Sequence, residues 1–255
     1  MVLQIPMLAK KVVMITGVGG GLGQALAAAF AAHGSKVVGV ARREQSVQEI
    51  AALVDSEAFL GCIADVADFS QLELAAKQAV ERFGCIDILF NNAAVYPRRN
   101  FVDETDQQWL ESLAVNVNGV ANGCKAVLPH MIAGGYGRIY NVGSFADVAP
   151  IPDSAAYSAS KGAVRALTKA IAADICGIAA DIEVHEWVPG HLKTRMSEFT
   201  GLDPAVAAGW AVELASIDHA RTPNCIFENN RELLPPKRLK ERILDRLRAL
   251  VGQGR

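Results

Sequence analysis

The sequence predicts a single α/β domain built on a doubly wound, parallel β-sheet with helices on both faces. Short apolar runs rich in β-branched residues alternate with longer segments of helical periodicity along most of the chain, and this alternation is typical of parallel sheets covered by crossover helices. The first run also ends in a glycine cluster that leads into an alanine-rich helical segment. A chain of 255 residues suits one large domain better than two small ones, so we expect one domain over residues 1–255.

The elements of the first half follow from these runs. Lys11–Thr16 reads KVVMIT, a buried strand, and the helix Leu22–His33 follows it, with Gly34 as a helix stop. Lys36–Val40 is the second strand. The same criteria predict the remaining elements of this half: helix Glu44–Val54, strand Ala58–Ile63, helix Ser70–Phe83 ending at Gly84, and strand Ile86–Phe90.

The second half continues the alternation and then loses it. The expected elements are a long helix from about Asp106 to Ile132, strand Gly137–Val142, helix Ala156–Cys176, strand Ile182–Val188 and a possible short strand Cys225–Glu228. Residues 191–224 have weak periodicity and several Gly and Pro. The C-terminal segment 236–255 contains a charged amphipathic helix, Lys237–Leu250.

Composition excludes several classes of function. The formal net charge is −2 without a basic stripe, so no nucleic-acid partner is expected. No apolar run reaches the roughly 18 residues of a membrane span, and the apolar opening Met1–Leu8 lacks the basic start and the length of a signal peptide. The five cysteines have no C-x-x-C or metal-ligand spacing, which favours reduced thiols in a cytoplasmic protein and no bound metal.

The glycine cluster reads Thr16-Gly17-Val18-Gly19-Gly20-Gly21-Leu22-Gly23 and lies between a strand and a helix. In that setting glycines allow a tight turn, let the backbone approach a pyrophosphate and seat the helix close to the sheet. We therefore expect a dinucleotide-binding turn formed by Gly17, Gly19, Gly21, Leu22 and Gly23. The alternative is an ordinary flexible loop, although so many glycines carry a high entropic cost.

Three side chains later in the chain are candidates for acid–base chemistry. Tyr157 and Lys161 are spaced i, i+4 near the start of a predicted helix, so both project from one face. A phenol with a pKa of about 10 is a poor acid or base at pH 7, and a nearby ammonium lowers that pKa. Ser144 follows the fifth strand, at the edge where α/β sheets bind ligands. Taken in isolation, Tyr157 and Lys161 are more simply explained as a contact on the surface of a helix, and Ser144 as a turn residue.

Six motifs, in this order, resemble those of the short-chain dehydrogenases/reductases. They are Thr16-Gly-x-x-x-Gly-x-Gly, Asn91-Asn92-Ala93-Ala94, Asn116, Ser144, Tyr157-Ser-Ala-Ser-Lys161 and Pro189-Gly190, which together span about residues 10 to 195. The resemblance implies a Rossmann-type single domain without a metal, assembled as a homodimer or homotetramer. It also implies an NAD(P)-dependent oxidoreductase that moves a hydride to or from a carbonyl carbon.

The resemblance assigns roles to individual residues. Tyr157 would be the general acid or base, Ser144 would hold the substrate oxygen, and Asn116 would hold a water that links Lys161 to solvent, with Asn118 as the competing candidate. The cofactor contacts would be Asp65 and Val66 at the adenine, Asn92 with Ala93, Tyr157 and Lys161 at the nicotinamide ribose, and Leu192 and Thr194, after Pro189 and Gly190, at the carboxamide. For Asp65 the alternative is an N-cap or turn residue.

The end of the second strand favours NADP(H) over NAD(H). Users of NAD carry an acidic residue there that binds the ribose 2′-hydroxyl. This chain has Ala41 followed by Arg42 and Arg43, so no carboxylate repels a 2′-phosphate and Arg42 can bind it. Gly20 departs from many NADP users of the family, which carry a basic residue at that position. NAD(H) stays possible if the two arginines are merely solvated.

The substrate is expected to be a small carbonyl or alcohol held by apolar walls. Residues 191–218 correspond to a family segment that covers the substrate, and we expect it to be mobile without ligand. The expected substrate-binding residues are Ser144, Phe145, Tyr157, Met196 and Phe199, with Val95, Tyr96, Val148, Leu202 and Trp210 as further wall candidates. They favour an apolar ketone or aldehyde, whereas Arg98, Lys193 and Arg195 at the rim would suit an anionic substrate.

Two regions depart from the family pattern. Glu183, His185 and Trp187 stand on the sixth strand where the family has other residues. Glu186 on the same strand has no evident partner, and His185 is expected to be a satisfied core histidine. The C-terminal segment differs as well, so the family's tetramer geometry is not carried over. Dimerisation through Ala156–Cys176 remains an expectation.

Three classes of function compete. The leading one is a carbonyl reductase or alcohol dehydrogenase. A non-catalytic dinucleotide-binding sensor on the same fold would show a broken Ser–Tyr–Lys set, and here the set is intact. An epimerase or dehydratase of the family's extended branch would be longer and have different glycine spacing.

Overall fold

A computed structural model describes residues 7–178, 180–217 and 225–233 of the chain. The predicted C-terminal helix at 236–255 lies outside these residues, as do Met1–Pro6 and residues 218–224. None of the described helices is long and apolar enough to cross a membrane.

One eight-stranded sheet organises the structure, with the strand order β3-β2-β1-β4-β5-β6-β7-β8. The first seven strands are parallel and β8 is antiparallel to β7. The order reverses between β1 and β4, the kind of switch point where such sheets bind ligands. The strands are β1 Val12–Thr16, β2 Lys36–Ala41, β3 Phe59–Ile63, β4 Ile88–Asn91, β5 Tyr136–Val142, β6 Asp181–Val188, β7 Ile226–Glu228 and β8 Arg231–Glu232.

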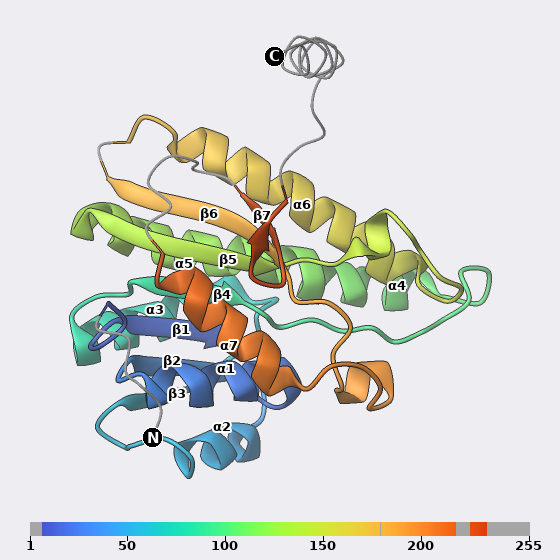
Figure 1. Cartoon of the computed structure of the whole chain (residues 1–255). Coiled ribbons are helices and arrows are strands. Elements are labelled where there is room, and N and C mark those ends of the chain that lie inside the picture. Colours follow the sequence, from blue (N-terminus) through green and yellow to red (C-terminus); the bar gives the residue numbers. More distant parts are fainter. Residues whose placement is uncertain (1–6, 179, 218–224, 234–255) are drawn as a thin grey trace, which may run out of the picture.

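Helices cover both faces, which confirms the predicted doubly wound α/β fold (Figure 1). One apolar cluster joins the sheet to α1, α2 and α7, and a second joins it to α3, α5 and α6. The helical elements are α1 Gly21–Ala32, α2 Glu44–Ala51, α3 Phe69–Phe83, α4 Asp106–Leu113, η1 Ala114–Asn118, α5 Gly119–Gly134, η2 Phe145–Asp147, α6 Ala155–Ile175, η3 Arg195–Ser197 and α7 Pro204–Ala215.

Local sequence signals fix the ends of several helices. The Asp68 carboxylate accepts hydrogen bonds from the N–H groups of Ser70 and Gln71, and α3 stops at Gly84, whose φ is 89°. Thr105 and Gln108 form a capping box at the start of α4. The fourth strand starts two residues later than predicted, at Ile88.

The predicted long helix from Asp106 to Ile132 is confirmed as one unbroken helical run, with one feature that the sequence did not indicate, a π turn in its interior. The run comprises α4 and α5, with the π-helical turn η1 between them. A π turn adds one residue to the helical ring and is frequent at functional sites. Here it buries the side chain of Asn116.

The prediction of weak order over 191–224 was wrong for residues 204–215, which form α7. Asp203 caps this helix and Pro204 starts it. Ala207, Ala208 and Ala211 are fully buried, and α7 lies beside α1 (Figure 1). Because α7 is apolar around much of its circumference, its sequence lacks the amphipathic period that marks a surface helix. The helix therefore belongs to the core, and only residues 191–203 remain as the segment expected to cover a substrate.

Candidate active site

A cavity of about 1470 Å³ opens at the carboxyl ends of the central strands. The predicted site residues that do not line it are Gly23, Asn116 and the wall candidates Val148, Leu202 and Trp210. The predicted residues that do line it are Gly17, Gly19, Gly21, Leu22, Arg42, Arg43, Asp65, Val66, Asn92, Ala93, Ser144, Phe145, Tyr157, Lys161, Pro189, Gly190, Leu192, Thr194, Met196 and Phe199. The fold thus brings together residues that are up to 182 positions apart, between Gly17 and Phe199.

The glycine turn requires its glycines. Gly17 has a φ of 74°, and a Cβ there would lie 2.8 Å from Ala93 Cα. A Cβ on Gly23 would overlap the carbonyl oxygen of Gly17, so Gly23 allows α1 to pack closely against the turn. Asn92 Nδ2 donates to the carbonyl oxygens of Thr16 and Gly17 at 2.9 and 3.2 Å. The turn is therefore tied to the end of β4.

The glycine turn leaves the start of α1 open to the cavity. Gly20, the residue before α1, has no side chain with which to cap the helix, so the first N–H groups of α1 have no side-chain partner there. Gly20, Gly21 and Leu22 all line the cavity. Thr194 approaches from the segment after β6, since a Cβ on Gly21 would come within 2.9 Å of its Cγ2. Such a cradle between a helix start and a crossing loop suits a phosphate group.

Basic and hydroxyl side chains gather at the end of β2. Arg42 is largely exposed, and its Nη1 lies 3.9 Å from Asp65 Oδ2. Ser46, in the first turn of α2, also lines the cavity, and its Oγ would lie 2.9 Å from a Cβ on Gly19. Sequence reasoning missed Ser46, although a hydroxyl three residues after Arg43 was a usable signal.

Lys161 is fixed in a buried position by the backbone of β5. Its side chain is 3% exposed, and Nζ donates to the Val142 carbonyl oxygen at 2.7 Å. Burial lowers the pKa of Lys161 to about 8, while the charge of Glu186 acts in the opposite direction. A lysine of this kind is still mostly charged at neutral pH but loses its proton far more readily than a surface lysine.

Tyr157 lies one helical turn before Lys161 on α6, and the expected net lowering of its pKa was wrong for this structure. Burial raises the pKa of Tyr157, and a hydrogen bond with Ser144 only partly opposes that shift. Lys161 Nζ lies over the Tyr157 ring, 5.5 Å from its centroid. Tyr157 is therefore held in its protonated form, hydrogen-bonded to the serine.

Ser144 caps the start of η2, two residues after the end of β5. Its Oγ accepts the Ala146 N–H at 3.1 Å, so the hydroxyl is held at the first residue of the turn. Its carbonyl oxygen accepts a hydrogen bond from Arg165 at 3.2 Å. The Ser144 hydroxyl is therefore presented to Tyr157 by a turn that is anchored on both its side chain and its backbone.

Asn116 supports the site from behind the cavity wall. Its Oδ1 accepts the Val95 N–H at 2.8 Å, and its Nδ2 donates to Val95 O at 2.9 Å and to Ser160 Oγ at 3.0 Å. The side-chain amide thus joins the loop after β4 to α6. The expected role of Asn116 in holding a water stays a prediction. Because the side-chain amide is occupied by these hydrogen bonds, the backbone of Asn116 is the part left to hold that water.

Aromatic and charged residues from the loop after β4 also line the cavity. The ring of Tyr96 stacks on Tyr157 with 4.5 Å between centroids, and Arg98 lies over the Tyr96 ring at 5.4 Å. Arg98 Nη1 also contacts Glu198 Oε1 at 2.8 Å. Sequence reasoning did not identify Glu198, whose role depends on the two loops meeting.

The unusual residues of β6 have partners. Glu186 is bound by Arg165 through two nitrogens. His185 is a core histidine, as expected: one ring nitrogen contacts Glu183 at 3.0 Å and the other accepts the Cys225 N–H at 3.1 Å. Both acidic side chains are thereby compensated, which explains how the strand tolerates them.

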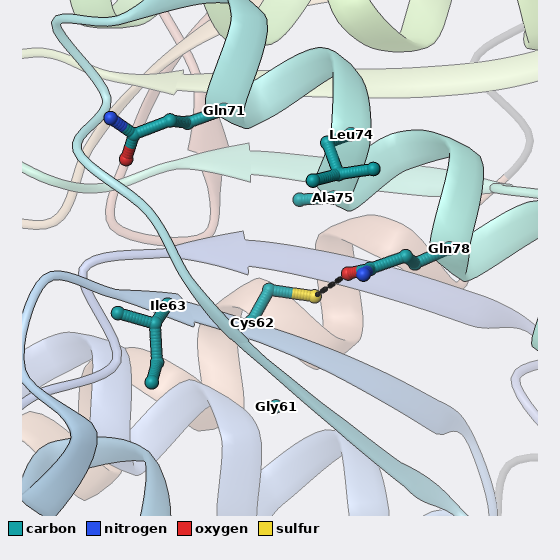
Figure 2. A pocket seen from close by; sticks show the side chains of 7 residues that line it. All are labelled: Gly61, Cys62, Ile63, Gln71, Leu74, Ala75 and Gln78. Atoms are coloured by element: carbon teal, nitrogen blue, oxygen red, sulfur yellow. Dashed lines mark hydrogen bonds between the residues drawn. The ribbon is translucent and has the colours of Figure 1, made fainter.

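A second, smaller cavity of about 230 Å³ lies between β3 and α3 (Figure 2). Cys62 Sγ points at Gln78 Oε1 there, 3.6 Å away. Burial raises the pKa of Cys62 to about 11, so its thiol stays protonated and unreactive at neutral pH. The lining residues are Gly61, Cys62, Ile63, Gln71, Leu74, Ala75 and Gln78, none of them charged. The larger cavity is therefore the candidate active site.

Comparisons with known proteins agree with this assignment. The family model described as short chain dehydrogenase matches residues 11–204. The chain is 35% identical over 196 residues to a 2-(R)-hydroxypropyl-CoM dehydrogenase of Xanthobacter autotrophicus, covering 74% of this chain and 78% of that protein. It is 35% identical over 197 residues to a trans-4-hydroxycyclohexanecarboxylate dehydrogenase of Sinomonas cyclohexanicum, covering 74% and 75%.

Solved structures give the same picture. A 3-ketoacyl-(acyl-carrier-protein) reductase from Brucella melitensis, complexed with NADH, is similar with a TM-score of 0.79 and 28% identity, covering 89% of this chain and 100% of that one. A levodione reductase is similar with a TM-score of 0.78 and 26% identity, covering 87% and 97%.

Proposed function

The chain belongs to the short-chain dehydrogenase family and is an NAD(P)-dependent oxidoreductase, and we propose that it transfers a hydride between NADP(H) and an apolar ketone or aldehyde, or the matching secondary alcohol. The observation that carries the proposal is the convergence of Ser144, Tyr157 and Lys161 at one cavity with the glycine turn. A carbonyl reductase is the form of this activity that the site supports best.

The residues present fit a nicotinamide dinucleotide. The cradle at Gly17 excludes even a Cβ, and the first turn of α1 offers N–H groups to a pyrophosphate. In the proposed arrangement Asp65 and Val66 hold the adenine, Asn92 and Lys161 hold the nicotinamide-side ribose, and Leu192 and Thr194 hold the carboxamide. When bound, the dinucleotide supplies or accepts the hydride.

The chain's own residues handle the proton. Ser144 binds the substrate oxygen beside the Tyr157 hydroxyl, and Tyr157 donates its proton to that oxygen during reduction. Burial keeps Tyr157 protonated, which suits a general acid. The ammonium of Lys161, held on Val142 O, stabilises the negative charge left on Tyr157 after transfer.

The preference for NADP(H) rests on the end of β2. Arg42 is exposed at the cavity, Arg43 follows it, and Ser46 adds a hydroxyl. The carboxylate of Asp65 pairs with Arg42 only loosely, at 3.9 Å, so a 2′-phosphate can take its place. A charge-assisted contact of this type is stronger than a neutral hydrogen bond.

The preference for an apolar substrate rests on Tyr96, Phe145, Met196 and Phe199, which line the same cavity as Tyr157. The names of two relatives describe hydroxylated compounds, which supports an alcohol or ketone as substrate class. The test is direct. NADPH and NADH are titrated by fluorescence, and a panel of carbonyls is then screened by loss of NADPH absorbance.

We expect tighter binding of NADPH and a kcat/KM that increases with the apolar bulk of the carbonyl. If small keto acids are the best substrates, the basic residues Arg98, Lys193 and Arg195 at the cavity become the substrate anchors and the apolar proposal is rejected.

A further inference from the structure

Arg165 connects both ends of the turn that carries Ser144. Its Nη2 donates to the Ser144 carbonyl oxygen at 3.2 Å, and its Nη1 lies 2.7 Å from Asp147 Oδ2 at the end of η2. Its Nε and Nη2 also contact the two carboxylate oxygens of Glu186 at 2.9 and 3.0 Å. One planar guanidinium, which does not itself line the cavity, therefore fixes the turn, a geometry that lysine cannot reproduce.

Glu186 borders the backbone that holds Lys161. Its side chain is 1% exposed, and its Oε1 lies so close to Gly143 that a Cβ there would overlap it. Gly143 follows Val142, whose carbonyl oxygen accepts the Lys161 hydrogen bond. The Glu186 charge acts on Lys161 through this short separation, and it raises the Lys161 pKa against the larger effect of burial.

The charges around Lys161 are balanced. Arg165 on α6 and Lys161 are positive, whereas Glu186 on β6 and Asp147 on η2 are negative. Tyr157 is the titratable neighbour on α6, and the η1 turn, which also packs on α6, has only uncharged side chains. When one charged side chain of such a buried cluster is removed, the charge of its partner is left buried without compensation.

We propose that Arg165 and Glu186 are positioning residues of the active site: Arg165 fixes the turn that presents Ser144, and Glu186 keeps the buried Lys161 in its charged form. The consequence for turnover rests on the proposed function. The consequence for the charge of Lys161 is independent of the proposed function.

Titration of Lys161 tests the role of Glu186 without any need for activity. The full chain is labelled with ¹³Cε-lysine, and the Lys161 signal is assigned by its loss in Lys161→Met. In Glu186→Gln, which keeps the shape and removes the charge, we expect the Lys161 pKa to fall. In Arg165→Gln, which frees the Glu186 charge, we expect it to rise. These opposite directions keep the test decisive if one variant does not fold.

The matched control lies on the same strand. Glu183 is as buried as Glu186 and pairs with Arg138 at 3.2 Å. Successive side chains of a strand alternate between its two faces, so Glu183, three residues before Glu186, lies on the other face of β6. Glu183→Gln should therefore leave the Lys161 titration unchanged. An unchanged Lys161 pKa in Glu186→Gln or Arg165→Gln, or an equal shift in Glu183→Gln, overturns the role of Glu186.

Turnover tests the role of Arg165. Arg165→Lys keeps the charge but has a single donor centre, so we expect kcat to fall by up to about a hundredfold, the scale of a small misplacement of a reacting group. The Kd of NADPH should stay the same, because Arg165 touches the Ser144 turn and not the glycine turn. The control Arg138→Lys removes an even more buried arginine on β5, and it should lower the melting temperature with kcat unchanged.

An unchanged kcat in Arg165→Lys, or an equal loss in Arg138→Lys, overturns the positioning role of Arg165. If the unmodified protein binds NADPH but reduces no carbonyl, the proposed function fails, whereas the Lys161 titration still decides the role of Glu186.

Discussion

Arg98 and Glu198 form an ion pair of 2.8 Å that joins the loop after β4 to the segment after β6 at the outer end of the cavity. Both residues have left-handed backbone conformations, with φ of 47° and 54°. Their side chains are 42% and 73% exposed, so the pair contributes little to global stability. Its position instead suits a contact that restrains residues 191–203 over the bound substrate.

Breaking this ion pair should loosen residues 191–203 without unfolding the protein. In Glu198→Gln we expect faster amide hydrogen exchange over 191–203 and an almost unchanged melting temperature, because an exposed pair is worth at most about 1 kcal/mol. Exchange in this segment should slow when NADPH and a carbonyl bind. Glu57→Gln, which breaks the comparably exposed pair with Arg82, serves as control. Equal exchange in Glu198→Gln and the unmodified protein would contradict the restraint.

Replacement of the proton donor should abolish turnover selectively. Tyr157→Phe keeps the ring that stacks on Tyr96 but removes the hydroxyl, so we expect kcat to fall by at least about 10²–10⁴, the range for acid–base catalysis. Circular dichroism should not change, and the Kd of NADPH should change far less than kcat, because the other cofactor contacts remain. Tyr136→Phe, at the opposite end of β5, is the control. Near-normal turnover in Tyr157→Phe would reject the assigned mechanism.

The sheet was predictable because strands buried on both faces must be apolar throughout, as in Val12–Thr16 and Lys36–Ala41. The glycine turn was predictable for a related reason, since Gly17 and Gly23 occupy positions where no side chain fits. Here a local requirement of the backbone dictates the residue type, so the sequence displays it directly.

Features that depend on packing between distant elements were not predictable. The π turn at Asn116 shifts the helical register by one residue and hardly changes the apolar pattern. Arg165 reads as an ordinary helix residue, because its partner Glu186 is 21 positions away and meets it only when α6 packs on β6. The raised pKa of Tyr157 likewise follows from burial, which spacing to Lys161 does not reveal.

The choice of cofactor should depend on Arg42. In Arg42→Ala we expect NADPH binding to weaken by about 1.5–3 kcal/mol, the value of a hydrogen bond to a charged group, and NADH binding to stay nearly constant. Fluorescence titration of both cofactors measures this difference. Arg82→Ala, far from the cavity on α3, controls for net charge. Equal losses for the two cofactors, or a preference of the unmodified protein for NADH, would contradict the assignment.

The buried ammonium of Lys161 should leave a signature in the pH dependence of stability. Its pKa is lowered from 10.5 to about 8 in the folded protein. Between these values the unfolded chain binds the proton and the folded chain does not, so the free energy of unfolding increases with pH in this window. Since one pKa unit corresponds to about 1.4 kcal/mol, the total gain is of the order of 3 kcal/mol.

This gain is best measured as a difference from Lys161→Met, which has similar length and no charge. Burial raises the pKa values of the Cys62 and Cys124 thiols, and their titration lowers the stability of the unmodified protein and of Lys161→Met alike at alkaline pH. Subtraction therefore removes these contributions and isolates Lys161. We expect urea unfolding to show that the stability of the unmodified protein relative to Lys161→Met rises from pH 8 to pH 10. A flat difference would mean that Lys161 titrates normally, and that its ammonium is not held in the buried position against Val142.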